Sequence, residues 1–167
     1  MDLFNINDNG AIFSDDADRE YRYSLWRIWD DNLPMIMFIG LNPSTANEIT
    51  DDPTIRRVKK FASDWGYGGV YMLNLFAYVT PYPEELSKCN DPVADNDLHL
   101  KLFGEICDEI IFAWGSFDEA KERAKKVIQM FPKAKALIIN KDGTPRHPLY
   151  VKGDTIPVPY AGWLHVL

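Results

Sequence analysis

The stretch MIMFIGLNPSTA, residues 35–46, joins an unbroken apolar run to a polar cluster through a glycine. A short continuous apolar run is typical of a strand that is covered on both faces of a sheet. In open α/β sheets, ligands bind beside the carboxyl ends of such strands. The turn after the run is therefore the first candidate ligand-binding segment, and its residues are Gly40, Leu41, Asn42, Pro43 and Ser44.

Three further apolar runs have the same character, at residues 70–76, 109–115 and 136–140. Segments with helical spacing separate the runs, and the first of them opens at Asp52-Pro53, a helix cap followed by proline. Strands that alternate with helices predict right-handed crossovers and a mainly parallel sheet between two helical layers. The expected fold is therefore an α/β protein, a three-layer α/β/α sandwich around a mainly parallel four-stranded central sheet.

The N-terminal part of the chain has a different pattern. Residues 1–20 are polar and acidic and contain the turn pair Asn9-Gly10, which predicts an arm or a short hairpin. Residues 21–29 alternate between large apolar and polar side chains, which predicts a half-exposed strand at the edge of the sheet. A chain of 167 residues buries one substantial core, so residues 21–167 are expected to form a single α/β domain.

The composition argues against several classes of protein. The formal net charge of −7 disfavours strong binding to duplex DNA, because that binding needs Lys and Arg to neutralise phosphates. No apolar run approaches the roughly 18 residues of a membrane span, and the N-terminus lacks a signal-peptide pattern, so we expect a cytoplasmic location and no membrane contact. Cys89 and Cys107 lack metal-ligand spacing and the glycine motifs of nucleotide cofactors are missing, so we predict neither metal nor cofactor.

Polar residues stand at the ends of the predicted strands, and parallel strands bring such ends to one edge of a sheet. Asn74 interrupts the apolar run VYMLNLF, while Asn140 and His147 follow the last predicted strand. The Asn74 amide offers a donor and an acceptor, which suits the edge of a pyrimidine, and tying down a neighbouring loop is an equally open alternative. His147 is either an acid-base group or a residue that braces its own loop.

Three further residues are candidates for contact with a ligand. Arg56 and Arg57 lie near the start of a predicted helix, where positive charge is slightly unfavourable, so binding of an anionic group is one explanation for them. Phe76 could stack on a planar ring or belong to the core. We interpret Asp52 as the helix cap rather than as a catalytic base, because capping alone accounts for it.

Four segments in one order resemble a bacterial and phage family known as domain of unknown function 1643 (DUF1643). The segments are FIGLNPSTA, DPTIRR, GYGGVYMLNLFAY and RHPLY, and the resemblance covers roughly residues 20–162. Because the motifs are separate and keep their order, the match is specific for the family. The family name implies no activity.

A more distant resemblance is to the uracil-DNA glycosylase superfamily. Residues 40–44 are similar to its first motif, a strand that ends in Gly-x-Asn-Pro-Gly in some members, which implies that Asn42 positions water. The strand asparagine that reads the uracil edge in that superfamily would be Asn74. The histidine of its closing His-Pro-Ser motif, which faces a carbonyl of the base, would be His147.

The sequence departs from this pattern at two places. Ser44 stands where a glycine is usual, and Leu149-Tyr150 replaces the serine and the wedge that enters the minor groove, so the resemblance does not extend to base capture from duplex DNA. The predicted function is a glycosylase-like hydrolase of N-glycosidic bonds in single-stranded nucleic acid or nucleotides, with Asn42 and His147 as catalytic residues. The alternative is a non-catalytic module that binds a nucleobase or nucleotide as a sensor. The sequence leaves open which base is bound and the oligomeric state.

Overall fold

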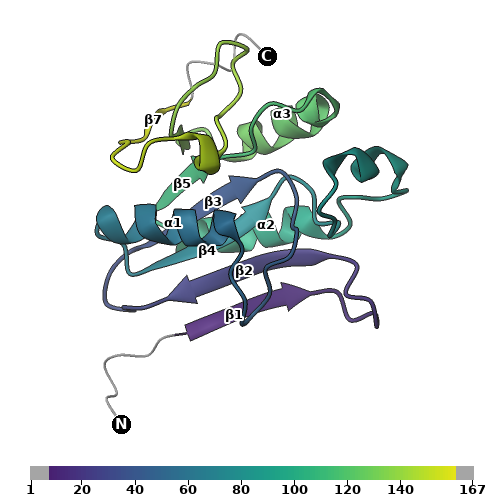
Figure 1. Ribbon diagram of the computed structural model, residues 1–167, viewed down its shortest axis with the longest axis horizontal. Helices are drawn as coiled ribbons and strands as arrows, with labels where there is room; N and C mark the ends of the chain where they lie inside the picture. Colours follow the sequence, from purple (N-terminus) through teal and green to yellow (C-terminus); the bar gives the residue numbers. More distant parts are fainter. Residues whose placement is uncertain (1–7, 161–167) are drawn as a thin grey trace.

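The structure is a computed structural model that describes residues 8–160, and its strands form one mixed sheet (Figure 1). The strand order is β1-β2-β4-β3-β5-β6-β7. The strands are β1 (Asp8–Phe13), β2 (Arg22–Ile28), β3 (Met35–Gly40), β4 (Gly69–Asn74), β5 (Glu109–Phe112), β6 (Lys135–Ala136) and β7 (Val158–Pro159). The α-helices are α1 (Pro53–Asp64), α2 (Asn96–Ile106) and α3 (Lys121–Met130), and short 3-10 turns are η1 (Pro83–Lys88), η2 (Asp118–Ala120) and η3 (Pro148–Tyr150).

The α/β class predicted from the sequence is confirmed. Strands β4, β3, β5 and β6 are neighbours and pair in parallel. The antiparallel hairpin of β1 and β2 extends the sheet on one side, and β7 extends it on the other. The prediction was a four-stranded central sheet with an N-terminal edge strand or hairpin. The structure has the hairpin, and β7 is a further strand that the sequence did not predict.

Strand β2 lies inside the sheet, which corrects the expectation that residues 21–29 form an edge strand. Strand β1 pairs along the outer side of β2. Asn9 and Gly10 are part of β1, where they pair with Arg27 and Trp26 of β2, and they do not form a turn. Gly10 leaves room for the Trp26 indole, which a Cβ atom at this position would overlap. The turn signal of Asn9-Gly10 is overridden because cross-strand packing requires the glycine in β1.

The two faces of β3 contact two separate apolar clusters. Ile36 and Phe38 pack with α1, whereas Met37 and Ile39 pack with side chains of α2 and α3. Figure 1 shows α1 in front of the sheet and α2 behind it. Because successive side chains of a strand point to opposite faces, a strand covered on both faces must be apolar at every position. This arrangement explains why the apolar run of β3 is unbroken.

Local signals set the helix boundaries in part. Asp52 caps α1, since its side chain accepts a hydrogen bond of 2.9 Å from the Ile55 N–H and Pro53 takes the first helical position. The helix predicted over residues 117–131 is divided into η2 and α3.

None of the helices among residues 8–160 is long and apolar enough to cross a membrane.

Candidate functional site

A cavity of about 200 Å³ opens at the carboxyl ends of β3 and β4. A single water needs only ~10–15 Å³ of such space, so the cavity has room for a ring-sized ligand. Other lining side chains come from β2, from the start of α1 and from the chain after β5, and they include Arg22, Asp52, Thr54 and Trp114. Of the residues predicted from the sequence, six line the cavity together: Gly40, Leu41, Asn42, Ser44, Asn74 and His147.

Gly40 is the residue that makes room for Asn74. The two residues are paired in the register of β3 and β4, at the last position of each strand. A Cβ atom on Gly40 would lie 2.7 Å from Asn74 Oδ1 and 2.7 Å from Met72 Cε. The glycine that ends the apolar run therefore allows the neighbouring amide to reach the cavity.

The Asn74 side chain is buried, with 3% of its surface exposed, and it lines the cavity. Its backbone carbonyl accepts a hydrogen bond of 2.7 Å from Asn96 Nδ2, which also donates to the Leu75 carbonyl. The loop is thus tied down by Asn96, while the Asn74 amide has no hydrogen-bond partner among the described residues. The amide lies at the cavity wall with both its donor and its acceptor free in the described part of the chain, so this side chain is available for a ligand.

Asn42 is held in one orientation by its loop. Its Nδ2 donates to the carbonyl oxygens of Pro43 at 3.0 Å and Thr80 at 2.8 Å. These bonds link the turn after β3 to the loop after β4, and they leave Oδ1 as an acceptor at the cavity wall. Asn42 can therefore orient a water molecule through Oδ1 while it keeps the two loops together.

The geometry of His147 defines its tautomer. Nδ1 accepts a hydrogen bond of 3.2 Å from the Leu149 N–H, and this contact caps η3. In the neutral ring the proton then resides on Nε2, which becomes a donor. Burial lowers the pKa of His147 below its ordinary value of 6.5, and the nearby Asp52 carboxylate opposes this shift. His147 is thus a neutral donor at pH 7.

Arg57 supports the loop that carries His147 and does not line the cavity. Its guanidinium donates to the carbonyls of Pro148, at 3.4 Å, and of Val151, and it lies over the Phe61 ring. These contacts join α1 to η3. The structure therefore gives Arg57 a bracing position between α1 and the His147 loop, and the predicted anion contact stays a prediction.

Several other predicted residues lie outside this cavity. Arg56 is exposed and donates to the Asp51 carbonyl at 3.1 Å, Phe76 belongs to the core cluster that contacts α2, and Pro43 is a buried residue of the turn. Asn140 lines an adjoining cavity, and its amide is engaged by Thr144 and Arg146 in the loop after β6. These four residues contribute to loop and core structure in the described chain.

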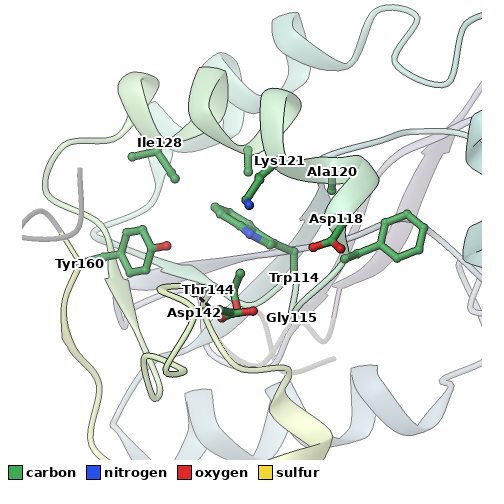
Figure 2. A pocket seen from close by; sticks show the side chains of 11 residues that line it. Trp114, Gly115, Asp118, Ala120, Lys121, Ile128, Asp142, Thr144 and Tyr160 are labelled. Carbon is green, nitrogen blue, oxygen red and sulfur yellow. Dashed lines mark hydrogen bonds between the residues drawn. The ribbon is translucent and has the colours of Figure 1, made fainter. Parts of the chain in front are cut away.

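Trp114 separates three neighbouring cavities. It lines the main cavity, the adjoining one of about 360 Å³ that holds Asn140, and a smaller one of about 70 Å³ beneath α3. Figure 2 shows the indole in the middle of the small cavity, with Lys121 and Tyr160 around it. The next residue, Gly115, has a φ of +76°, which favours glycine, and its N–H donates to the Pro145 carbonyl at 2.8 Å. This bend brings the end of β5 beside the His147 loop.

Arg22 is one of several cavity-lining residues that were not predicted from the sequence, and it is the one that carries a positive charge. Because β2 is antiparallel to β4, the first residue of β2 lies at the carboxyl end of β4, where the Arg22 N–H donates to the Ala77 carbonyl at 2.9 Å. The side chain is 3% exposed, and burial lowers its pKa to about 10, with Asp52 opposing the shift. Alternation in residues 21–29 predicted a strand but contained no signal for the direction of pairing.

The model of one protein family, described as "Protein of unknown function (DUF1643)", matches residues 22–149. The chain belongs to the DUF1643 family. The matched region of this DUF1643 chain includes every cavity-lining residue discussed above, from Arg22 to His147. No curated protein and no solved structure matches the chain.

Proposed function

We propose that the cavity binds a nucleobase and that the protein is a glycosylase-like hydrolase of N-glycosidic bonds in single-stranded nucleic acid or nucleotides. The observation that carries this proposal is that Asn74 and His147, from distant segments, line one cavity. A base with one edge on the amide and a carbonyl oxygen on the ring N–H would satisfy both side chains. The similarity of residues 40–44 to the first glycosylase motif supports the same interpretation.

The proposal extends to the fold, which we take to be a three-layer sandwich like that of the uracil-DNA glycosylase superfamily. Two features support it. Four neighbouring strands pair in parallel, and apolar clusters lie against α1 on one face and against α2 and α3 on the other. The net charge of −7 supports a substrate other than duplex DNA.

In the proposed reaction, a water oxygen forms a bond to the sugar carbon as the bond from that carbon to the base nitrogen breaks. Positive charge develops on the sugar and negative charge on the departing base. The Nε2–H of His147 would donate to a base carbonyl and stabilise the negative charge. Oδ1 of Asn42 would orient the water, and the proton that the water releases would pass to solvent, since the Asp52 carboxylate is engaged as the cap of α1.

The deciding experiment incubates the protein with single-stranded DNA and RNA that contain uracil, with duplex DNA, and with free nucleosides and nucleotides. Released bases are separated and identified by mass spectrometry. We expect one substrate to lose its base with wild-type protein and the release to fall at least about 100-fold in Asn42→Ala, because water loses its orienting acceptor. Release by Asn42→Ala at the wild-type rate would contradict the mechanism.

One observation favours a second candidate, a module that binds a base without hydrolysing it. Both protons of the Asn42 amide are already engaged by the Pro43 and Thr80 carbonyls, so this residue has a structural use that does not need catalysis. If no base is released while one nucleoside raises the melting temperature, binding without hydrolysis is the better description.

Replacing Asn74 by Asp should change which base is accepted. The substitution preserves the size of the side chain but replaces an amide, which both donates and accepts, by a buried carboxylate. An ionised carboxylate accepts hydrogen bonds and cannot donate them. We expect affinity for the preferred base to fall about tenfold or more. One hydrogen bond is lost, because a carboxylate oxygen then faces an acceptor atom of the base where the amide N–H had donated to it. Calorimetric titration with a set of nucleosides measures the change. Identical preferences in the two proteins would exclude a base-reading role for Asn74.

A further inference from the structure

Arg22 carries a buried charge that the proposed reaction does not use. Its Nη1 donates to the Ala46 carbonyl at 3.0 Å, and its Nε has no hydrogen-bond partner among residues 8–160. Of the residues that the structure describes, none brings a carboxylate oxygen within salt-bridge distance of this guanidinium. A buried charge is costly unless it is paired, so Arg22 lacks the partner that burial normally requires.

Arg27, on the same strand, shows what a structural arginine looks like in this protein. It is also buried, but its Nε pairs with Asp51 at 2.8 Å, and its other nitrogens donate to the carbonyls of Trp26 and Asn47. Arg27 does not line the cavity, whereas Arg22 does. The difference indicates that the missing partner of Arg22 is a ligand in the cavity.

Further donors line the cavity together with Arg22. The N-terminus of α1 reaches the wall at Thr54, whose N–H and hydroxyl are without partners in the described part of the chain, and the hydroxyl of Ser44 also lines it. The carboxylate of Asp52 is nearby, with Oδ1 engaged by the Ile55 N–H as the helix cap. A helix N-terminus and an arginine fork both favour phosphate, whose oxygens accept several hydrogen bonds at once.

We propose that Arg22, Thr54 and Ser44 form a phosphate-binding subsite, so that the ligand of this cavity is a nucleoside phosphate rather than a free base or nucleoside. This inference rests on the proposed function for the identity of the base, while the phosphate contact rests on Arg22 and the donors of Thr54 and Ser44 beside it. The cavity of about 200 Å³ shares Trp114 and His147 with the adjoining cavity of about 360 Å³. Together they offer more space than a base requires.

The first test compares ligands on the wild-type protein by calorimetric titration with deoxyuridine, deoxyuridine monophosphate and a uracil-containing dinucleotide. We expect the monophosphate to bind about tenfold or more tightly than the nucleoside, as hydrogen bonds to a charged group imply. If the monophosphate binds most tightly of the three compounds, the natural ligand is a free nucleotide. If the dinucleotide binds most tightly, the natural ligand is a single-stranded nucleic acid. Equal affinities for nucleoside and both phosphates would overturn the subsite.

The second test uses Arg22→Met, with Lys60→Gln as a control that removes one exposed charge from the far end of α1. Inorganic phosphate, compared with chloride at equal ionic strength, should raise the melting temperature of wild type and Lys60→Gln but not of Arg22→Met. The advantage of monophosphate over nucleoside should fall to within about twofold in Arg22→Met. A phosphate effect that survives in Arg22→Met would exclude Arg22 as its source.

The outcomes separate the subsite from the proposed function. Stabilisation by phosphate without affinity for any nucleoside would keep the subsite and remove the nucleobase proposal. If a nucleoside binds and its phosphorylated form binds no more tightly, the nucleobase proposal is kept and the phosphate subsite is removed. Arg22→Met should fold at least as stably as wild type, because it removes an unpaired buried charge, and Arg22→Lys should keep part of the phosphate effect. If Arg22→Met does not fold, two other measurements decide whether the phosphate subsite exists: the phosphate effect in Arg22→Lys and the affinities of the wild-type protein for nucleoside, monophosphate and dinucleotide.

Discussion

Replacing His147 by Asn is expected to reduce base release about 100- to 1,000-fold while the protein stays folded. An asparagine Oδ1 takes the place of Nδ1, so it can still accept the Leu149 N–H and cap η3. It has no group at the position of Nε2 and loses the donor that faces the base. Single-turnover rates on the substrate identified by base release measure the effect.

Replacing His147 by Gln provides the matched comparison. The glutamine amide nitrogen reaches the position of Nε2 and retains a donor, but it gives up the contact with Leu149. We therefore expect Gln to keep more activity than Asn and to lose more stability, by about 0.5–2 kcal/mol for the missing cap. If Asn retained full activity, a donor at Nε2 would play no part in the reaction.

The pH dependence of stability checks the protonation state of His147 independently of activity. Because burial lowers its pKa in the folded protein, the unfolded chain binds the proton more readily. The stability that the neutral ring contributes is therefore present above pH 6.5 and is lost as the pH falls below that value. The difference in free energy of unfolding between wild type and His147→Asn should shrink from pH 7.5 to pH 5 in urea titrations.

Replacing Arg27 by Met is expected to lower the free energy of unfolding by about 3–5 kcal/mol. Arg27 is 2% exposed and holds the segment before α1 through Asp51 and the Asn47 carbonyl. Its removal leaves Asp51 half-buried with only Lys59, and it removes a donor from the carbonyls of Trp26, Asn47 and Thr50. Chemical denaturation monitored by tryptophan fluorescence measures the loss.

Lys59→Met is the matched control for Arg27→Met, because Lys59 pairs with the same carboxylate at 2.9 Å. The Lys59 side chain is more than a third exposed, so its removal should cost no more than about 1 kcal/mol. Equal losses in the two variants would show that burial does not distinguish the two partners of Asp51. A stable Arg27→Met would also remove the contrast on which the interpretation of Arg22 relies.

Local chemistry made much of the fold and part of the site predictable. The apolar run of residues 35–40 must be buried on both faces in any arrangement, and Asp52-Pro53 caps a helix through contacts within four residues. Asn74 was conspicuous because an amide in an apolar strand needs a partner wherever the strand lies. Such features depend on near neighbours in the chain, and the sequence by itself determined them.

Long-range pairing decided the rest. Arg22 reaches the cavity only because β2 pairs antiparallel with β4, and Arg57 braces the His147 loop only because η3 packs on α1. Phe76 lies in the core because it joins the apolar cluster that includes Leu100 of α2. An arginine has the same local pattern whether it meets a carboxylate, a carbonyl or a ligand, so its role follows from the groups that tertiary structure brings to its guanidinium.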